Sequence, residues 1–176
     1  MFISTFIYLH IIYLKCFAYL GQNPPKRGEN IQVKKLSEIS EIHTGVRLNR
    51  LKEKNTSLKK VIKKISSENI LEYEYTVESV PNSINGKFIS QKNDIIISLL
   101  DPGSVCKLEK EGLVIPMQFA IIRLKEGYNP DYVYHFLDSI VFHKKLHILL
   151  EGGALKIIKV ADLKNIEIYI PELEKQ

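Results

Sequence analysis

The sequence predicts an α+β fold: a mixed, mainly antiparallel twisted sheet with one long helix at about residues 129–151 and several short helices. Two observations predict it. Between residues 70 and 124, short runs of β-forming residues alternate with turn residues, as in consecutive antiparallel strands. The clearest helical periodicity in the chain follows at 129–151. We therefore expect a sheet at the centre of the fold.

Length and composition set the size of this fold. The chain has 176 residues, of which 45% are hydrophobic and 26% charged, which suits one domain with a core and excludes a disordered chain. Its two cysteines, Cys16 and Cys106, cannot build a disulfide framework, and no CxxC or paired-histidine spacing indicates zinc. We expect a reducing, cytoplasmic setting.

The first thirty residues differ from the rest. Residues 1–20 are a nearly unbroken apolar run of about the length of a membrane-spanning helix, but His10 and Lys15 interrupt it. As a signal peptide the run lacks a basic start and a clear cleavage site, and a helix that packs on an apolar partner is the third interpretation. Residues 21–30, GQNPPKRGEN, have the composition of a linker, so one domain is expected at 31–176.

The first elements of that domain are short. Residues 33–43 predict a strand or helical turn with three apolar side chains facing inward, and Thr44-Gly45 ends it. These three are Leu36, Ile39 and Ile42. In the polar, basic stretch that follows, LKKVIKKI at 58–65 has helical spacing of its apolar residues. It predicts a short amphipathic helix with four lysines on its other face.

The central segments predict strands. The run at 95–100 is apolar except at Ser98, as in a strand buried on both faces, and Asp101-Pro102-Gly103 follows as a tight turn. Further strands are expected at 73–77, 87–89, 105–108, 113–115 and 119–124, with a turn region at 81–86.

The long helix has start and stop signals. Asn129 can cap it, Pro130 suits its first position, and Asp131 favours the positive end of the helix dipole. Its apolar stripe comprises Val133, Phe136, Leu137, Ile140, Val141, Leu146, Leu149 and Leu150, and Gly152-Gly153 ends it. A strand at 155–158, a helical turn at 161–165 and a strand at 166–170 are expected after it.

Charge is segregated along the chain. The formal net charge is +5, but residues 31–66 carry ten Lys or Arg against three Glu, a net of +7. Residues 67–141 carry six basic and eleven acidic groups, a net of −5. A polyanion is therefore expected to meet the basic stretch at 47–64 first.

The sequence contains no recognisable catalytic motif, neither GxGxxG, a Walker loop, GxSxG nor HExxH. His143 and His147 are spaced i,i+4 and could form part of a metal site, with Glu151 four residues further on, but an ordinary histidine pair is the simpler interpretation. Cys106 is expected to be a buried, unreactive thiol. Asp94 and Asp101 flank the apolar strand and are expected to be turn formers.

Short motifs follow one another in order along residues 31–176 and end on a Pro-x-Leu-x-x-Gln signature. The motifs are VKKLSEISEI at 33–42 before Thr44-Gly45, KFI at 87–89, KNDIIIS at 92–98, GLVI at 112–115, FAIIRL at 119–124, NPDYVYHFL at 129–137, GGALK at 152–156, VADLKNI at 160–166 and IPELEKQ at 170–176. In this order the set resembles one target-recognition domain of the specificity subunit of type I restriction–modification enzymes.

The resemblance implies a target-recognition-domain fold and a non-catalytic protein. Such a subunit places sequence-reading loops against double-stranded DNA and holds the methylation subunits, which bind S-adenosylmethionine and modify adenine. The implied partners are therefore double-stranded DNA and the methylation and restriction subunits of the same system. No cofactor is expected on this chain itself, since S-adenosylmethionine belongs to the methylation subunit.

The basic stretch offers both kinds of DNA contact. Arginine is suited to guanine and asparagine to adenine, whereas lysines supply phosphate contacts. The candidate readers are Arg47, Asn49, Arg50, Lys52, Lys54 and Asn55. The candidate phosphate contacts are Lys59, Lys60, Lys63 and Lys64, and the resemblance adds Lys156 and Lys159 as secondary candidates.

The chain also departs from the family pattern. The family's subunit has two such domains joined by long spacer helices, and this sequence stops at Gln176, where a spacer would begin. Asp101 follows a strand where the family is often basic, so no DNA contact is expected there. The alternatives are a half-subunit, an inactive fragment, or a membrane-anchored or exported binding domain. A half-subunit could pair through an apolar N-terminal helix with a second copy or a second half.

Overall fold

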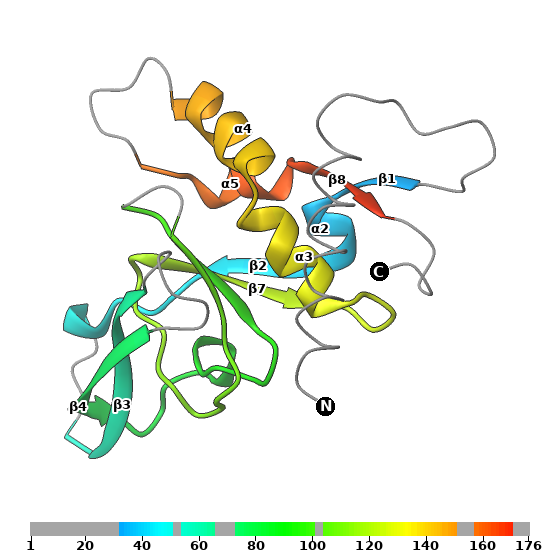
Figure 1. Ribbon diagram of the computed structural model, residues 1–176. Helices are drawn as coiled ribbons and strands as arrows, with labels where there is room; N and C mark the ends of the chain where they lie inside the picture. Colours follow the sequence, from blue (N-terminus) through cyan, green and yellow to red (C-terminus); the bar gives the residue numbers. More distant parts are fainter. Residues whose placement is uncertain (1–31, 51–53, 66–72, 101–103, 151–156, 171–176) are drawn as a thin grey trace, which may run out of the picture.

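The computed structural model describes residues 32–50, 54–65, 73–100, 104–150 and 157–170. Within them the fold is α+β, as predicted, with every named strand pair antiparallel. A four-stranded sheet has the order β2-β7-β5-β6, and two further sheets are the two-stranded pairs β1-β8 and β3-β4 (Figure 1). The strands are β1 (Gln32–Lys35), β2 (Ser40–Thr44), β3 (Thr56–Ile65), β4 (Tyr73–Pro81), β5 (Ile95–Ser98), β6 (Val105–Lys107), β7 (Phe119–Leu124) and β8 (Glu167–Ile170). The helices are α2 (Leu36–Ile39), α3 (Pro130–Leu137), α4 (Ile140–Leu150) and α5 (Val160–Lys164), with 3₁₀ turns η1 (Leu48–Arg50) and η2 (Gly86–Phe88).

The four-stranded sheet is buried on both faces, and the prediction of a strand buried on both sides at 95–100 is confirmed for Ile95–Ser98, whereas Leu100 lies beyond the strand and is 63% exposed. Side chains of β5 alternate between two apolar clusters, with Ile95 and Ile97 in one and Ile96 in the other. Helices α3, α4 and α5 contribute to the first cluster, where Phe136 and Phe142 are almost fully buried. The second cluster lies on the opposite face and includes Ile62 and Ile65 of β3 together with the Leu108–Ile115 segment. The fold therefore has three layers, with the four-stranded sheet between a helical layer and a β-rich layer, and an apolar cluster fills each of the two interfaces.

The helix predicted at 129–151 is two helices, α3 and α4. Its predicted start is confirmed, because the Asn129 side chain accepts hydrogen bonds from the backbone N–H groups of Asp131 (2.9 Å) and Tyr132 (3.3 Å). The Ser139 hydroxyl donates to the Phe136 carbonyl at 2.6 Å and accepts from the Phe142 N–H at 3.3 Å. This serine thus ends one helix and caps the next, because its hydroxyl competes for backbone groups. The predicted stop at Gly152-Gly153 lies outside the described residues.

The predicted amphipathic helix at 58–65 is wrong, since these residues belong to strand β3. Val61 and Ile62 are adjacent in sequence, both fully buried, and face different apolar clusters, as strand alternation requires. Ile65 is also buried, but Leu58 is 76% exposed, against the prediction. Pairing with β4 along its whole length supplies backbone hydrogen bonds that local periodicity cannot reveal.

The remaining elements follow the prediction with smaller changes. Residues 33–43 form β1, the single turn α2 and most of β2, and Leu36, Ile39 and Ile42 are buried as expected. Residues 113–115 make isolated bridges only, through Val114, and η2 stands where a strand was expected at 87–89. The described part of the strand predicted at 155–158, residues 157–158, is not a strand.

Several predictions fall outside the described residues. These are the apolar segment at 1–20, the linker at 21–30, the turn at 101–103 and the end of the long helix. In the part of the chain that the structure describes, no helix combines the length and the apolar character needed to span a bilayer.

Candidate nucleic-acid interface

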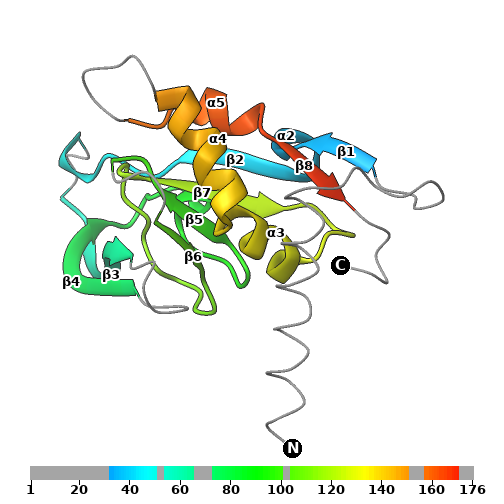
Figure 2. The same cartoon turned by 45° about the horizontal axis from the view of Figure 1, so that its top comes forward.

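Strands β3 and β4 form a two-stranded ribbon at the end of the molecule opposite the β1–β8 pair (Figures 1 and 2). The register runs from Thr56 opposite Pro81 to Ile65 opposite Tyr73, with a bulge between Ile62 and Lys64. Because side chains alternate along each strand, the register divides the ribbon between the two faces.

The first face has six exposed positions, which together are called here the Leu58 face, whereas Ile62 and Pro81 on the same side of the ribbon are buried. The Leu58 face comprises Thr56, Leu58 and Lys60 of β3 and Tyr75, Val77 and Ser79 of β4. Two contacts confirm that these side chains share a side. The Ser79 hydroxyl donates to the Thr56 hydroxyl at 2.6 Å, and the Lys60 ammonium lies 5.0 Å from the centre of the Tyr75 ring. Lys60 is the one charged residue among the six.

The second face, called the Glu78 face, carries carboxylates beside its lysines. Lys59 stands opposite Glu78, and Lys64 stands opposite Glu74. Lys63, in the bulge, forms an ion pair with Glu78. The Lys63 ammonium, followed by the Thr76 hydroxyl, lowers the pKa of Glu78 through hydrogen bonds. A helix would have put all four lysines on one side, whereas the strand leaves only Lys60 on a face without a carboxylate.

A short loop after β2 lies beside the ribbon. The backbone at Gly45 passes very close to the backbone at 115–116. A Cβ atom on Gly45 would lie 2.3 Å from the Pro116 carbonyl oxygen, so only glycine fits at this close approach. Next to it Val46 bridges to Pro116, and Val61 of β3 bridges to Val114. The stretch at 114–116 is therefore a shared neighbour of the loop and of the ribbon.

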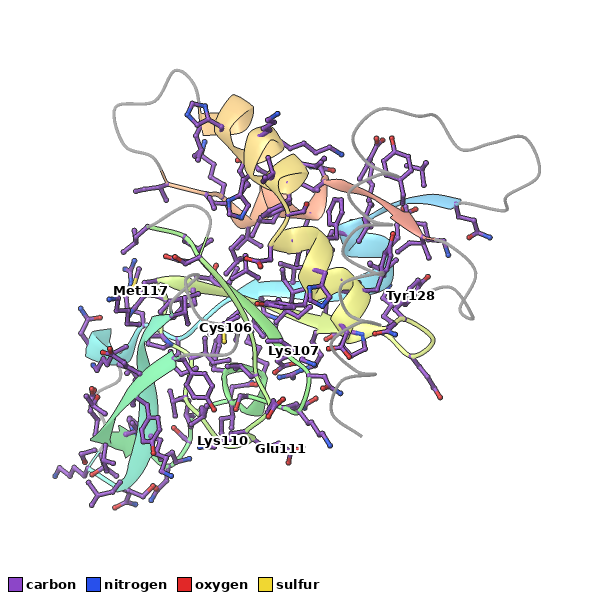
Figure 3. The ribbon with its side chains drawn as sticks, in the orientation of Figure 1. Cys106, Lys107, Lys110, Glu111, Met117 and Tyr128 are labelled. Atoms are coloured by element: carbon purple, nitrogen blue, oxygen red, sulfur yellow. The ribbon has the colours of Figure 1, made fainter. Side chains whose placement is uncertain are left out.

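A separate apolar cluster anchors this end of the molecule. Its buried members are Val46, Val61, Val80, Ile84 and Val114, and Leu48 of η1 packs against them. Because Leu48 is held there, its neighbours Arg47 and Asn49 are exposed beside the ribbon. The Arg47 Nε atom donates to the Met117 sulfur at 3.1 Å, and Figure 3 shows Met117 near the ribbon.

The structure thus brings together part of the predicted set. Arg47, Asn49, Lys54 and Asn55 are exposed at the ribbon's end of the molecule, where the Asn55 carbonyl accepts a hydrogen bond from the Asn82 N–H. Lys60, Lys63 and Lys64 are exposed on the ribbon, and Lys59 is half-buried there.

Three predicted residues cannot be placed, and one lies elsewhere. The side chain of Arg50 and all of Lys52 and Lys156 fall outside the described residues. Lys159 is exposed directly before α5. Its neighbour Ile158 packs into the cluster under the helices, so Lys159 belongs to the helical side of the sheet.

Sequence reasoning missed the apolar residues of the Leu58 face. Leu58, Val77 and Tyr75 are 76%, 58% and 39% exposed. The alternation in Tyr73–Val77 indicated a strand, but only the register with β3 identifies its exposed face.

It also missed the partner of Asp94. Arg123 of β7 donates through Nε to one oxygen of the Asp94 carboxylate at 2.8 Å and through Nη2 to the other at 2.6 Å. Asp94 is only 2% exposed and also accepts from the Gln91 N–H, so it forms a turn as predicted. Arg123 reaches the Ile89 carbonyl as well, and its hydrogen bonds to Asp94 raise its pKa. This ion pair fixes the segment at 89–94 to the central sheet.

The remaining candidates for chemistry are the Cys106 thiol and the His143/His147 pair. Cys106 is buried as predicted, and burial raises the pKa of its thiol to about 12. Among the described residues, no three His, Cys, Asp or Glu side chains are grouped so as to hold a metal ion, and Glu151 lies outside them.

The family described as "Type I restriction modification DNA specificity domain" matches residues 28–176. No curated protein matches the chain.

Three solved structures are similar in fold. The HsdS subunit from Thermoanaerobacter tengcongensis has a TM-score of 0.62 at 16% identity, over 98% of this chain and 40% of that one. A chain from a study of complex assembly and conformational transition of the type I R-M system has a TM-score of 0.64 at 16% identity, over 94% of this chain and 40% of that one. The type I restriction-modification S subunit from M. genitalium has a TM-score of 0.50 at 17% identity, over 85% of this chain and 36% of that one. The chain thus spans about two fifths of these relatives.

Proposed function

The chain belongs to the type I restriction modification DNA specificity domain family, and we propose that it is a non-catalytic, sequence-specific DNA-binding domain. The family match over residues 28–176 carries this proposal. The arrangement at one end of the molecule supports it, because exposed side chains suited to bases and to phosphates gather there on a ribbon and an adjoining loop. A two-stranded ribbon is narrow enough to enter the major groove of duplex DNA.

In this proposal the loop after Gly45 reads bases. Arg47 has the two-pronged donor geometry that matches guanine O6 and N7, and Asn49 and Asn55 have the donor and acceptor that match adenine N6 and N7. All three side chains are exposed. Arg50 and Lys52 remain predicted readers by sequence alone.

The carboxylates beside each lysine decide which lysines are suited to contact phosphate. Lys60 is exposed on the face without carboxylates, so it is suited to positioning the duplex. Lys54, a predicted reader, is exposed as well. Lys59, Lys63 and Lys64 stand beside Glu74 or Glu78, which weakens their attraction for phosphate. Lys156 and Lys159 remain secondary candidates.

We further propose that the domain directs the methylation and restriction subunits of a type I system to their site. One similar chain comes from work on the assembly of such a complex, which supports partners of this kind. S-adenosylmethionine is then a ligand of the methylation subunit, and the cytoplasm is the compartment in which these partners meet. A second copy or a second half-subunit would supply the other half of a split site.

Selection from a random duplex library tests the proposal. The full chain is incubated with the library at moderate and at high salt, and bound duplexes are sequenced. We expect a short enriched motif that persists as salt rises. Binding without enrichment that falls steeply with salt would identify a general phosphate-binding surface and contradict sequence reading. No binding would indicate an inactive fragment.

A further inference from the structure

Three apolar side chains are exposed together on the Leu58 face. Leu58, Val77 and Tyr75 are 76%, 58% and 39% exposed, on two paired strands. Leu58 stands opposite Ser79, and Val77 stands opposite Lys60, so Leu58 and Val77 are diagonal neighbours across the ribbon. Single exposed apolar residues are common in proteins, but a group of them on one surface marks a binding site.

The charges around this group limit what can bind. Lys60 is the one charged side chain of the face, and its ammonium is held 5.0 Å from the Tyr75 ring centre. Glu74 and Glu78 belong to the opposite face. An apolar surface edged by a cation, with the carboxylates turned away, suits a partner with an apolar patch next to an anion.

The major groove of DNA presents that combination at thymine. Its C5-methyl group is the apolar feature of the groove, and phosphates line the groove's edges. At a G·C pair, leucine and valine would cover the cytosine amino group and the guanine O6 without offering a hydrogen bond, which costs binding energy. Apolar side chains on a ribbon therefore favour thymine over cytosine at the position they contact.

We propose that Leu58 and Val77 read a thymine through its C5-methyl group, while Lys60, held by Tyr75, contacts a neighbouring phosphate. This inference rests on the proposed function and extends it from the polar loop at 47–55 to an apolar reading surface. It assigns a base preference to residues without hydrogen-bonding side chains.

Replacing thymine by deoxyuridine tests the proposal, because it removes only the methyl group. The full chain is titrated with the duplex enriched from the random library, in which thymines are replaced by deoxyuridine one at a time. At one position we expect binding to weaken about fourfold, the effect of losing one buried methyl-sized group (~0.8 kcal/mol). The variants Leu58→Ala and Val77→Ala should bind the thymine duplex more weakly and lose most of this discrimination.

A matched control is available on the distant β1–β8 sheet. Val33 of β1 is 53% exposed, close to the exposure of Val77, so Val33→Ala removes the same atoms from a surface outside the ribbon. It should bind like the unmodified chain and keep the full thymine preference. Thermal unfolding of each variant checks that the fold is retained, as expected for exposed positions.

The possible failures are distinguishable. An enriched motif without an A·T pair, or equal binding of thymine and deoxyuridine duplexes at every position, overturns methyl reading but leaves the proposed function intact. Full discrimination in both Leu58→Ala and Val77→Ala also overturns it, since the methyl would then be read elsewhere. The absence of any enriched motif contradicts the proposed function itself.

Discussion

At the scale of single residues, the ion pair between Asp94 and Arg123 has the most buried carboxylate of the ion pairs described. Its carboxylate is almost fully buried and its two hydrogen bonds are parallel. It joins a turn to the central sheet, and the reading surface lies on other elements. The residues that stabilise the fold and those proposed to contact DNA are therefore separable by mutation.

Replacing Asp94 by alanine should destabilise the fold by about 3–5 kcal/mol, because the guanidinium of Arg123 loses its partner in a partly buried site. Urea unfolding followed by circular dichroism measures the loss. The double variant Asp94→Ala/Arg123→Met should recover part of it. A loss below about 1 kcal/mol in the single variant would show that solvent compensates the arginine.

Arg47 and Lys60 should respond to mutation in different ways. Arg47→Ala should relax sequence preference by roughly 1–3 kcal/mol at one base pair if its guanidinium contacts guanine. Lys60→Ala should weaken binding to all sequences alike and reduce the salt slope by about one phosphate contact. Titrations of preferred and altered duplexes at several salt concentrations measure both, with Lys164→Ala, at an exposed position of α5, as the control. Identical behaviour of the two variants would contradict this division.

At the scale of elements, the ribbon shows what local sequence can and cannot predict. Buried Val61, Ile62 and Ile65 have helical spacing, and in the strand Ile62 and Ile65 reach the same cluster only because of the bulge between Ile62 and Lys64. The pairing with Tyr73–Pro81 that makes this segment a strand is not contained in its local pattern. Runs such as Ile95–Ser98 were predictable because they are apolar on both faces. The break at Ser139 was not predictable, since serine is tolerated in helices and acts here through a competing hydrogen bond.

The same reasoning applies to the candidate site. The exposed loop residues Arg47 and Asn49 could be singled out by residue type and charge. The sorting of Lys59, Lys60 and Lys64 between two faces needed the strand register, which no local pattern contains.

Removing the carboxylate of Glu78 should strengthen DNA binding by the ribbon. Glu78→Gln leaves Lys59 and Lys63 without their acidic neighbour, so affinity at low salt should rise and the salt dependence should steepen. Unfolding free energy should change by less than about 1 kcal/mol, because the ion pair is exposed. Weaker binding would mean that Glu78 itself contacts the DNA, for instance by accepting from a cytosine amino group.

At the scale of the whole molecule, Gly45 lies where the chain passes from the central sheet to the end that carries the ribbon. Its N–H donates to the Phe119 carbonyl at 2.9 Å, and a Cβ would clash with the backbone at 115–116. Gly45→Ala should therefore destabilise the chain by about 1–3 kcal/mol and weaken DNA binding as well. Chemical unfolding and duplex titration measure the two effects. Gly86→Ala is the matched control, since a Cβ there meets nothing within 4 Å.

The apolar cluster of Val46, Val61, Val80, Ile84 and Val114 is separate from the two clusters that bury the central sheet. The exposed positions around it can therefore be exchanged at little cost in folding free energy. Under the proposed function, in which a few surface side chains determine the DNA target, this division allows sequence preference to diversify under selection while the scaffold is inherited unchanged. New specificities can then arise by point substitution, without passing through an unfolded intermediate.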